Sequence, residues 1–321
     1  ADLAPPRPFD PERVDYGGLI AWKRPLLERA AGRFLAGASP ARRAAFEAFR
    51  REEKPWLEDY ALFIAVKEDY DRRAREESLP SSLWMELWPR SLALREPESL
   101  AAERERRAAE IERAEVLQFL FAEEWAAVKA AANRAGIAVV GDLPIFVALD
   151  SADVWTRREL FRLDPAGRPL EVAGVPPDYF SADGQLWGNP LYDWPAHEAE
   201  GFAWWTARIR AALSRYDCVR IDHFRGFEAY WAVPAGERTA RKGRWRKAPG
   251  EALFAAARKR LGAEPPIVAE DLGFITEEVR ALRDGLGLPG MRILQFAFDA
   301  AESGSAFDPR NGFLPHNYGE R

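Results

Sequence analysis

The chain is poor in the residues that build disulfides and metal centres, with one cysteine and three histidines among 321 residues. The single cysteine, Cys218, allows no internal disulfide framework, so we expect a reducing, cytoplasmic compartment. The histidines have no metal-ligand spacing to another histidine, to a cysteine or to a carboxylate pair. The sequence therefore gives no support to a disulfide-stabilised scaffold or to a zinc site.

Long apolar runs and targeting signals are missing as well. No apolar run approaches the roughly 20 residues needed to span a bilayer, and the first residues lack the basic and apolar regions of a signal peptide. The net charge is −5, with both signs spread along the chain, which argues against nucleic acid or a membrane as the main partner. Because the first residue is not methionine, we expect the natural gene product to be longer.

Motifs of two common enzyme classes are absent. No Gly-x-Gly-x-x-Gly or phosphate loop follows an expected strand, so a nucleotide-binding fold has no positive support. Neither Gly-x-Ser-x-Gly nor a Cys–His signature occurs, so acyl transfer is equally unsupported. Aromatic side chains, in contrast, are abundant: they make up 12% of the residues, and 12 of them are tryptophan. This surplus requires an explanation.

The first 135 residues have the pattern of a proline-rich lead followed by helices. Four prolines in residues 1–20 predict an extended linker. Residues 21–135 predict a helical subdomain, in which Ser39 as N-cap and Pro40 at the first helical position begin a long helix. Residues 98–135 predict at least one further long helix, with a charged face exposed to solvent.

From residue 136 to residue 321 the pattern changes to alternating strands and helices. Short β-rich apolar runs lie at residues 136–146, 216–224, 265–273 and 290–298. Helical patterns separate them at residues 201–215, 250–262 and 276–286. This alternation predicts parallel βαβ units. The long polar loops after the strands favour a (β/α) barrel with its site at the C-terminal strand ends, and a doubly wound open sheet is the alternative.

Carboxylates stand at the ends of three of these strands. Asp222 lies two residues beyond Arg220 on the same strand face, so the guanidinium should keep it ionised, which suits a nucleophile. Glu270 follows an apolar run with no neighbouring cation, which favours a raised pKa and an acid role. Together with Asp142, this pair is the equipment of retaining glycosidic-bond chemistry, at a separation of roughly 5 Å. The alternative for each is capping of the following helix, and we favour that alternative for Asp271.

An aromatic loop is expected at residues 151–205. Its segment 172–194 combines turn residues with large aromatic side chains and has neither a helical nor a strand period. Long irregular loops in compact domains are usually binding loops or lids. Sugar rings stack their apolar faces on aromatic planes, and their hydroxyls need polar partners such as Asn189. We expect Trp187 to face a ligand; the alternative is a small satellite core made by the loop itself.

Six stretches carry a resemblance to a known family: GDLPIFVALDSADVW, AGVPPDYFSADGQLWGNPLYDW, VRIDHFRGFEAYWAVP, VAEDLGFITEEV, GLPGMRILQFAF and FLPHNY. Over essentially its whole length the chain resembles glycoside hydrolase family 77, the amylomaltases of the α-amylase superfamily. The resemblance implies an α/β fold, a (β/α)8 TIM barrel with a helical insertion. It also implies transfer of a segment of an α-1,4-glucan or maltooligosaccharide to the 4-hydroxyl of an acceptor, ring closure included, with no metal or organic cofactor.

Position within these motifs implies individual roles. Asp222 in RIDHFRG corresponds to the nucleophile, and Glu270 in AEDLG to the general acid/base. Residues of the matched motifs that we expect to bind substrate are Asp142, Tyr179, Phe180, Trp187, Asn189, Arg220, His223 and His316. The aromatic members would stack glucose units and screen the glycosyl-enzyme intermediate from water, which is what separates a transferase from a hydrolase.

The chain also departs from the family pattern. Family members begin with two further strands that carry substrate-facing tyrosines, and they continue to a Thr-His-Asp motif with a third essential carboxylate. Neither feature occurs in the 321 residues. We therefore expect about four of the eight barrel strands here, and an isolated chain that cannot close the barrel and is inactive. A plain α-glucan hydrolase and a non-catalytic glucan-binding module are the alternative functions.

Overall fold

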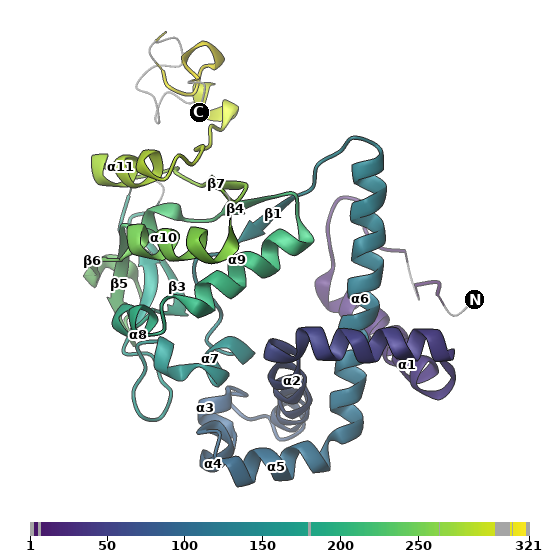
Figure 1. Ribbon diagram of the computed structural model, residues 1–321. Helices are drawn as coiled ribbons and strands as arrows, with labels where there is room; N and C mark the ends of the chain where they lie inside the picture. The colour runs from purple at the N-terminus through teal and green to yellow at the C-terminus, as the bar shows by residue number, and fades with distance from the viewer. Residues whose placement is uncertain are drawn as a thin grey trace. The chain divides into compact units, whose positions relative to one another are not determined.

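The computed structural model describes residues 3–5, 8–178, 181–262, 264–298, 309 and 311–318. The chain divides into two compact units, whose helices and strands are labelled in Figure 1. The first unit consists of Ala1–Ala127 and Asp150–Thr156, and the second of Val128–Leu149 and Arg157–Arg321. No helix in these described ranges has both the length and the apolar character that crossing a membrane would require.

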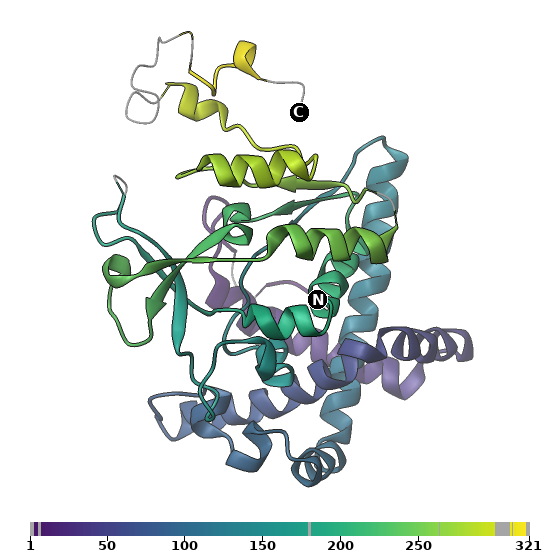
Figure 2. The ribbon, with the colours of Figure 1, turned by 60° about the vertical axis from the view of Figure 1, so that its left-hand side comes forward.

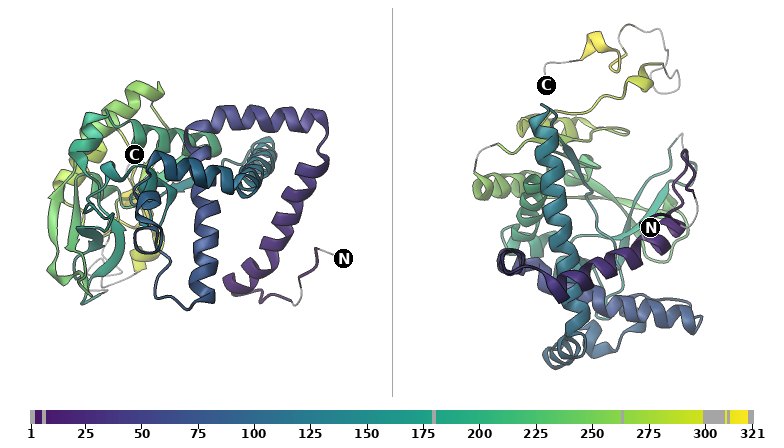
Figure 3. Two further views of the ribbon diagram at one scale, coloured as in Figure 1. Left: turned by 90° about the horizontal axis from the view of Figure 1, so that it is seen from below. Right: turned by 90° about the vertical axis from the view of Figure 1, so that its right-hand side faces the viewer.

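The first unit is helical, as the sequence predicts. Its helices are α1 (Tyr16–Gly37), α2 (Pro40–Glu76), α3 (Trp84–Leu87), α4 (Arg90–Ala93), α5 (Pro97–Arg106), α6 (Ala108–Arg134, whose last turns belong to the second unit) and α7 (Ala152–Thr156). The predicted start of α2 is confirmed, because the Ser39 side chain accepts the N–H of Arg42 and Pro40 is the first helical residue. Helix α2 is bent part-way along its length (Figure 3). Pro55 lies inside the helix and lacks the N–H that a straight helix needs.

The predicted extended linker at residues 1–20 is wrong at its C-terminal end. Helix α1 begins at Tyr16, because the carboxylate of Asp15 accepts the N–H of Gly18 at 2.9 Å and caps the helix. The prolines that exclude regular structure all precede this cap. The prediction of at least one long helix at residues 98–135 is confirmed. The segment forms two helices, α5 and α6, because Arg107 leaves the helical conformation with φ of −115°.

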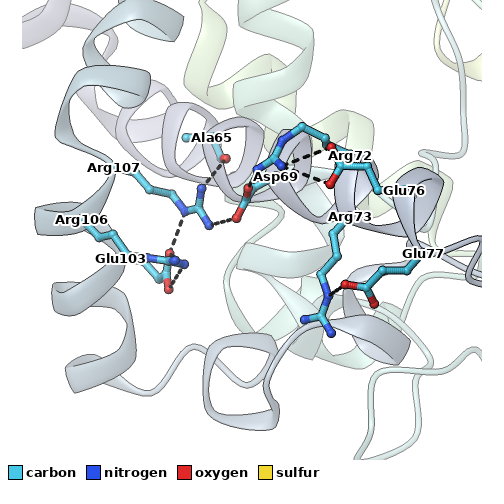
Figure 4. A network of polar contacts seen from close by, with 9 residues as sticks. All are labelled: Ala65, Asp69, Arg72, Arg73, Glu76, Glu77, Glu103, Arg106 and Arg107. Atoms are coloured by element: carbon cyan, nitrogen blue, oxygen red, sulfur yellow. Dashed lines mark hydrogen bonds and ion pairs between the residues drawn. The ribbon is translucent and has the colours of Figure 1, made fainter.

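Arg107, which lies between α5 and α6, also organises a network of polar contacts with α2 and α5 (Figure 4). Its side chain is almost completely buried, at 7% exposure. The guanidinium donates to the carbonyl of Ala65 at 3.4 Å, to Asp69 at 2.5 Å and to Glu103 at 2.7 Å. A buried arginine requires this number of acceptors, so the break between α5 and α6 is tied to the middle of α2.

The second unit is built on a parallel sheet with strand order β1-β4-β7. The strands are β1 (Val140–Leu143), β4 (Cys218–Ile221) and β7 (Ile267–Ala269), which confirms three of the predicted strand segments. Helices α9 (Ala203–Arg215), α10 (Gly250–Leu261) and α11 (Glu277–Gly285) occupy the predicted helical segments. Helices α9 and α10 pack against each other beside this sheet (Figure 1). Parallel strands connected through helices are the βαβ arrangement that the alternation predicts.

The strand predicted at residues 290–298 is wrong. Leu294–Phe298 form a 3-10 helix, η4, and residues 299 and 300 lie outside the described residues. The carboxylate of Asp271 accepts the N–H of Met291 at 2.7 Å, so a side chain takes a backbone donor that a sheet ladder would use. A short apolar run does not by itself distinguish a strand from another buried element.

The aromatic loop expected at residues 151–205 is wrong in its central part, which is regular structure. It contains η1 (Arg158–Leu160), β2 (Glu171–Val175), β3 (Gln185–Pro190) and α8 (Trp194–Ala199). Strands β2 and β3 form a hairpin within an antiparallel sheet of order β3-β2-β5-β6, with β5 at Ala229–Pro234 and β6 at Arg244–Lys247. Figures 1 and 2 show this sheet to one side of the parallel sheet. A register shift in β2 and the pairing with distant β5 hide the strand period from the sequence.

Candidate active site

Strand register brings the first two predicted carboxylates onto one arginine. Asp142 of β1 lies opposite Arg220 of β4. The guanidinium forms a bidentate ion pair with the Asp142 carboxylate, with Nε–Oδ1 and Nη2–Oδ2 distances of 2.9 and 3.0 Å. Nη2 also donates to Oδ1 of Asp222 at 2.8 Å. The side chains of Asp142, Arg220 and Asp222 are 59%, 27% and 42% exposed, so a ligand can reach this bridge. The ion pair that the Arg220–Asp222 spacing predicts is therefore formed.

Glu270 lies at the end of the neighbouring strand, β7, and is bound to the segment that carries Asp222. Its carboxylate accepts the N–H of His223 at 2.8 Å and of Leu272 at 2.9 Å, and its carbonyl accepts the N–H of Phe224 at 3.1 Å. Burial is the largest effect on the pKa of Glu270 and raises it, and the negative charge of Asp222 raises it further. The two N–H hydrogen bonds and the positive charge of Arg220 lower it. The net direction is upward, so the group retains its proton to higher pH than an ordinary glutamate.

His223 turns the chain between these carboxylates. Its backbone is left-handed, with φ of 50° and ψ of 48°, and the 3-10 helix η2 (Phe224–Phe227) follows. Burial lowers the pKa of His223 to about 4, and the charge of Arg225 adds to the shift, so the imidazole is neutral at pH 7. Its Nε2 is buried and finds no hydrogen-bond partner among the described residues. The tight turn depends on Gly226, since a Cβ there would lie 2.5 Å from Cδ1 of Ile145.

Trp187 on β3 contacts this turn. Its indole ring meets the imidazole of His223 edge to face, with centroids 4.9 Å apart, and lies 6.4 Å from the ring of Phe146. It is 37% exposed, so part of the ring faces solvent next to the turn at His223. Asn189, two residues further along β3, donates its side-chain N–H to the carbonyl of Val147 at 2.9 Å.

Other sequence-predicted residues are not joined to this cluster. Tyr179 and Phe180 lie outside the described residues. His316 is in η5 (Pro315–Asn317), where its Nε2 lies 2.8 Å from the carbonyl of Pro309, and none of its described contacts reaches Asp222 or Glu270.

Asp271, for which the sequence favours a structural role, is buried and paired with Arg283. It does not cap helix α11, whose N-cap residue is Thr276. The aspartate therefore supports the loop after β7 by an ion pair across the turn.

Sequence reasoning missed Arg225, which ties the turn after β4 to the loop after β7. It is buried, its guanidinium lies 3.9 Å from the ring centroid of Trp245, and it donates to the carbonyl of Phe274. Burial lowers the pKa of Arg225. These partners are distant in sequence, so no local signal reveals them.

The cluster offers carboxylate chemistry. The described residues hold no group of three or more histidine, cysteine, aspartate or glutamate side chains arranged to bind a metal ion. A partly exposed carboxylate beside an arginine and a half-buried carboxyl with a raised pKa, on adjacent strands, can act as nucleophile and proton donor on one bond.

Known proteins resemble this chain in sequence and in structure. The family model described as 4-alpha-glucanotransferase matches residues 3–321. The 4-alpha-glucanotransferase of Thermus thermophilus is 52% identical over 97% of this chain, and that of Synechocystis is 50% identical over 99%. A solved structure of amylomaltase from Streptococcus agalactiae in complex with acarbose superposes with a TM-score of 0.86 and 42% identity over 98% of this chain. The chain spans 58%, 59% and 59% of the lengths of these three proteins.

Proposed function

The chain belongs to the 4-alpha-glucanotransferase family, and on that premise we propose that its complete gene product transfers segments of α-1,4-glucans between sugar chains. The observation that carries the proposal is the presence of two unlike carboxyl groups: Asp222 is partly exposed and bound by Arg220, and Glu270 is half-buried at the end of the next strand, with a raised pKa. The acarbose complex of the Streptococcus agalactiae amylomaltase supports a glucan-like ligand. The chain spans about three fifths of its relatives, so the activity is proposed for the complete gene product.

In the proposed reaction Asp222 attacks the anomeric carbon while Glu270 gives its proton to the departing glycosidic oxygen. The glycosyl-enzyme ester then reacts with the 4-hydroxyl of an acceptor, and Glu270 takes the proton of that hydroxyl, which regenerates both groups. Arg220 holds Asp222 in place, and Asp142 lies where the donor sugar would bind. Trp187 covers the turn beside both carboxylates, so an acceptor ring stacked on it would displace water from the ester.

We also propose a larger architecture around this site. Strands β1, β4 and β7 would form part of a closed (β/α)8 barrel within residues 136–321, and residues 21–135 would form a helical insertion subdomain. Tyr179, Phe180, Asn189, His223 and His316 complete the proposed substrate contacts. A cytoplasmic location fits the single cysteine.

Incubation of the complete gene product with maltotriose tests the activity. Transfer produces glucose together with maltopentaose and longer chains, with little net gain in reducing ends. Glucose and maltose with reducing ends rising in step would instead establish a hydrolase. Asp222→Asn should abolish turnover, whereas a non-catalytic binding module would have no turnover to lose and would retain its glucan affinity in the variant.

A further inference from the structure

The backbone that follows β1 is held by side chains from outside its own segment. Residues 144–147 have no strand ladder, and Nη2 of Arg208 on α9 donates to the carbonyl of Pro144 at 2.9 Å. The hydroxyl of Tyr192 donates to the carbonyl of Ile145 at 2.6 Å. Nη1 of Arg208 lies 3.4 Å from both that carbonyl and the hydroxyl oxygen. Two consecutive carbonyls are therefore fixed by one guanidinium and one phenol.

The donors themselves have little freedom. The guanidinium of Arg208 lies 5.0 and 4.7 Å from the ring centroids of Trp204 and Trp205, both of which are buried. Tyr192 is buried as well, so its hydroxyl requires a partner. Stacking of a planar cation on aromatic faces fixes the direction of its N–H groups. This arrangement holds the segment after β1 in one position.

The held segment contacts the candidate active site on two sides. Ile145 packs against the turn at Gly226, where its Cδ1 lies 2.5 Å from the position of an added Cβ. The ring of Phe146 contacts Trp187, which in turn meets His223. A movement of residues 144–147 would therefore displace both Trp187 and the turn at His223, whose N–H donates to Glu270.

We propose that Arg208, together with Tyr192, is a positioning residue for the transfer step. By fixing the carbonyls of Pro144 and Ile145, it sets Trp187 against His223, in the turn between the catalytic carboxylates, without touching substrate. The inference rests on the proposed glucanotransferase function. Loss of the Arg208 donors releases the segment, Trp187 covers the glycosyl-enzyme less well, and water competes with the acceptor.

The test measures the ratio of transfer to hydrolysis from maltotriose, with kcat and acceptor KM, for variants of the complete gene product well below their melting temperatures. Arg208→Met keeps an apolar stem against the tryptophans but removes the donors, so the ratio should fall about fivefold, as for one lost hydrogen bond. Arg208→Lys reaches one carbonyl only and should restore part of the ratio. Tyr192→Phe should lower the ratio by about twofold to threefold.

Arg210→Met is the matched control. Arg210 lies on the same helix, is exposed, and donates to the carbonyl of Arg260 at 3.4 Å rather than to the segment after β1. It should keep the wild-type ratio. An unchanged ratio in Arg208→Met and Tyr192→Phe, in an enzyme whose wild type transfers, overturns the role of Arg208. If Arg208→Met does not fold, Arg208→Lys and Tyr192→Phe decide in the same way. A wild type that only hydrolyses would overturn the proposed function instead.

Discussion

Arg220→Met should remove the ion pairs that Arg220 makes with Asp142 and Asp222, while keeping an unbranched side chain at this position. Its N–H groups make contacts of 2.9 and 3.0 Å to Asp142 and of 2.8 Å to Asp222. A hydrogen bond to a charged group contributes about 1.5–3 kcal/mol. The side chains are partly exposed and their charges screened, so we place the combined effect at the lower end, about 3 kcal/mol. Expressed in the transition state, this is a loss of about 150-fold in kcat/KM.

The pH profile of the same variant gives a second readout. Burial raises the pKa of Glu270, and the positive charge of Arg220 lowers it. An acid catalyst acts while it is protonated, so kcat/KM falls as pH rises through the pKa of Glu270. Without Arg220 that pKa rises further, and the alkaline limb of the profile should move to higher pH.

Both quantities are measured with maltotriose on the complete gene product. Arg220→Lys keeps the charge but cannot grip two carboxylates, so it should retain the wild-type alkaline limb and lose about tenfold in kcat/KM. Arg73→Met is the control, since it removes an exposed 2.9 Å ion pair to Glu77 on helix α2. The reasoning is refuted if Arg220→Met stays within about threefold of wild type, or if its alkaline limb moves to lower pH.

Two further predictions concern stability. Gly226→Ala should lower the melting temperature by about 2–12 °C, because the new Cβ clashes with Ile145 and overpacking costs about 1–3 kcal/mol. An unchanged melting temperature would show that Ile145 can move aside. Arg107→Met should destabilise by about 2 kcal/mol, below the usual figure for a broken buried pair because Asp69 keeps Arg72 and Glu103 keeps Arg106. Arg107 is the main cause of the lowered pKa of Asp69, so this stabilisation is lost as pH falls through that pKa. Thermal unfolding at pH 7 and in acid should therefore show the gap between variant and wild type narrowing, and a gap that widens in acid would contradict the assignment.

The sequence allowed those parts of the fold to be predicted that depend on neighbouring residues. Strands β1, β4 and β7 are apolar runs that end at a carboxylate, and the spacing of Arg220 and Asp222 places both on one strand face. The parallel register then brings Asp142 opposite Arg220. The strand ends and the shared face need only the apolar runs and a period of two, whereas the register that pairs Asp142 with Arg220 comes from the structure.

The parts that could not be predicted depend on partners distant in the chain. The β2–β3 hairpin is stabilised by pairing with β5, and its glycines and register shift leave no period to detect. The hydrogen bond from Arg208 to the carbonyl of Pro144 joins residues that are 64 positions apart. Its acceptor is a backbone carbonyl, which has no sequence signature. The direction of the Glu270 pKa shift was inferred from its apolar run. One of the two N–H donors that oppose this shift, His223, is 47 residues away in the chain and could not be inferred.

That turn has a consequence for reaction stereochemistry. Successive N–H groups, of His223 and Phe224, bind the carboxylate and the carbonyl of Glu270, while Asp222 immediately precedes them in the chain. The separation of the two proposed catalytic groups is therefore set by a few backbone bonds. A spacing of about 5 Å gives retention of anomeric configuration, and a wider gap admits a water molecule and gives inversion. The backbone between Asp222 and Phe224 is therefore the part of this chain on which the spacing, and with it the anomer released, would depend.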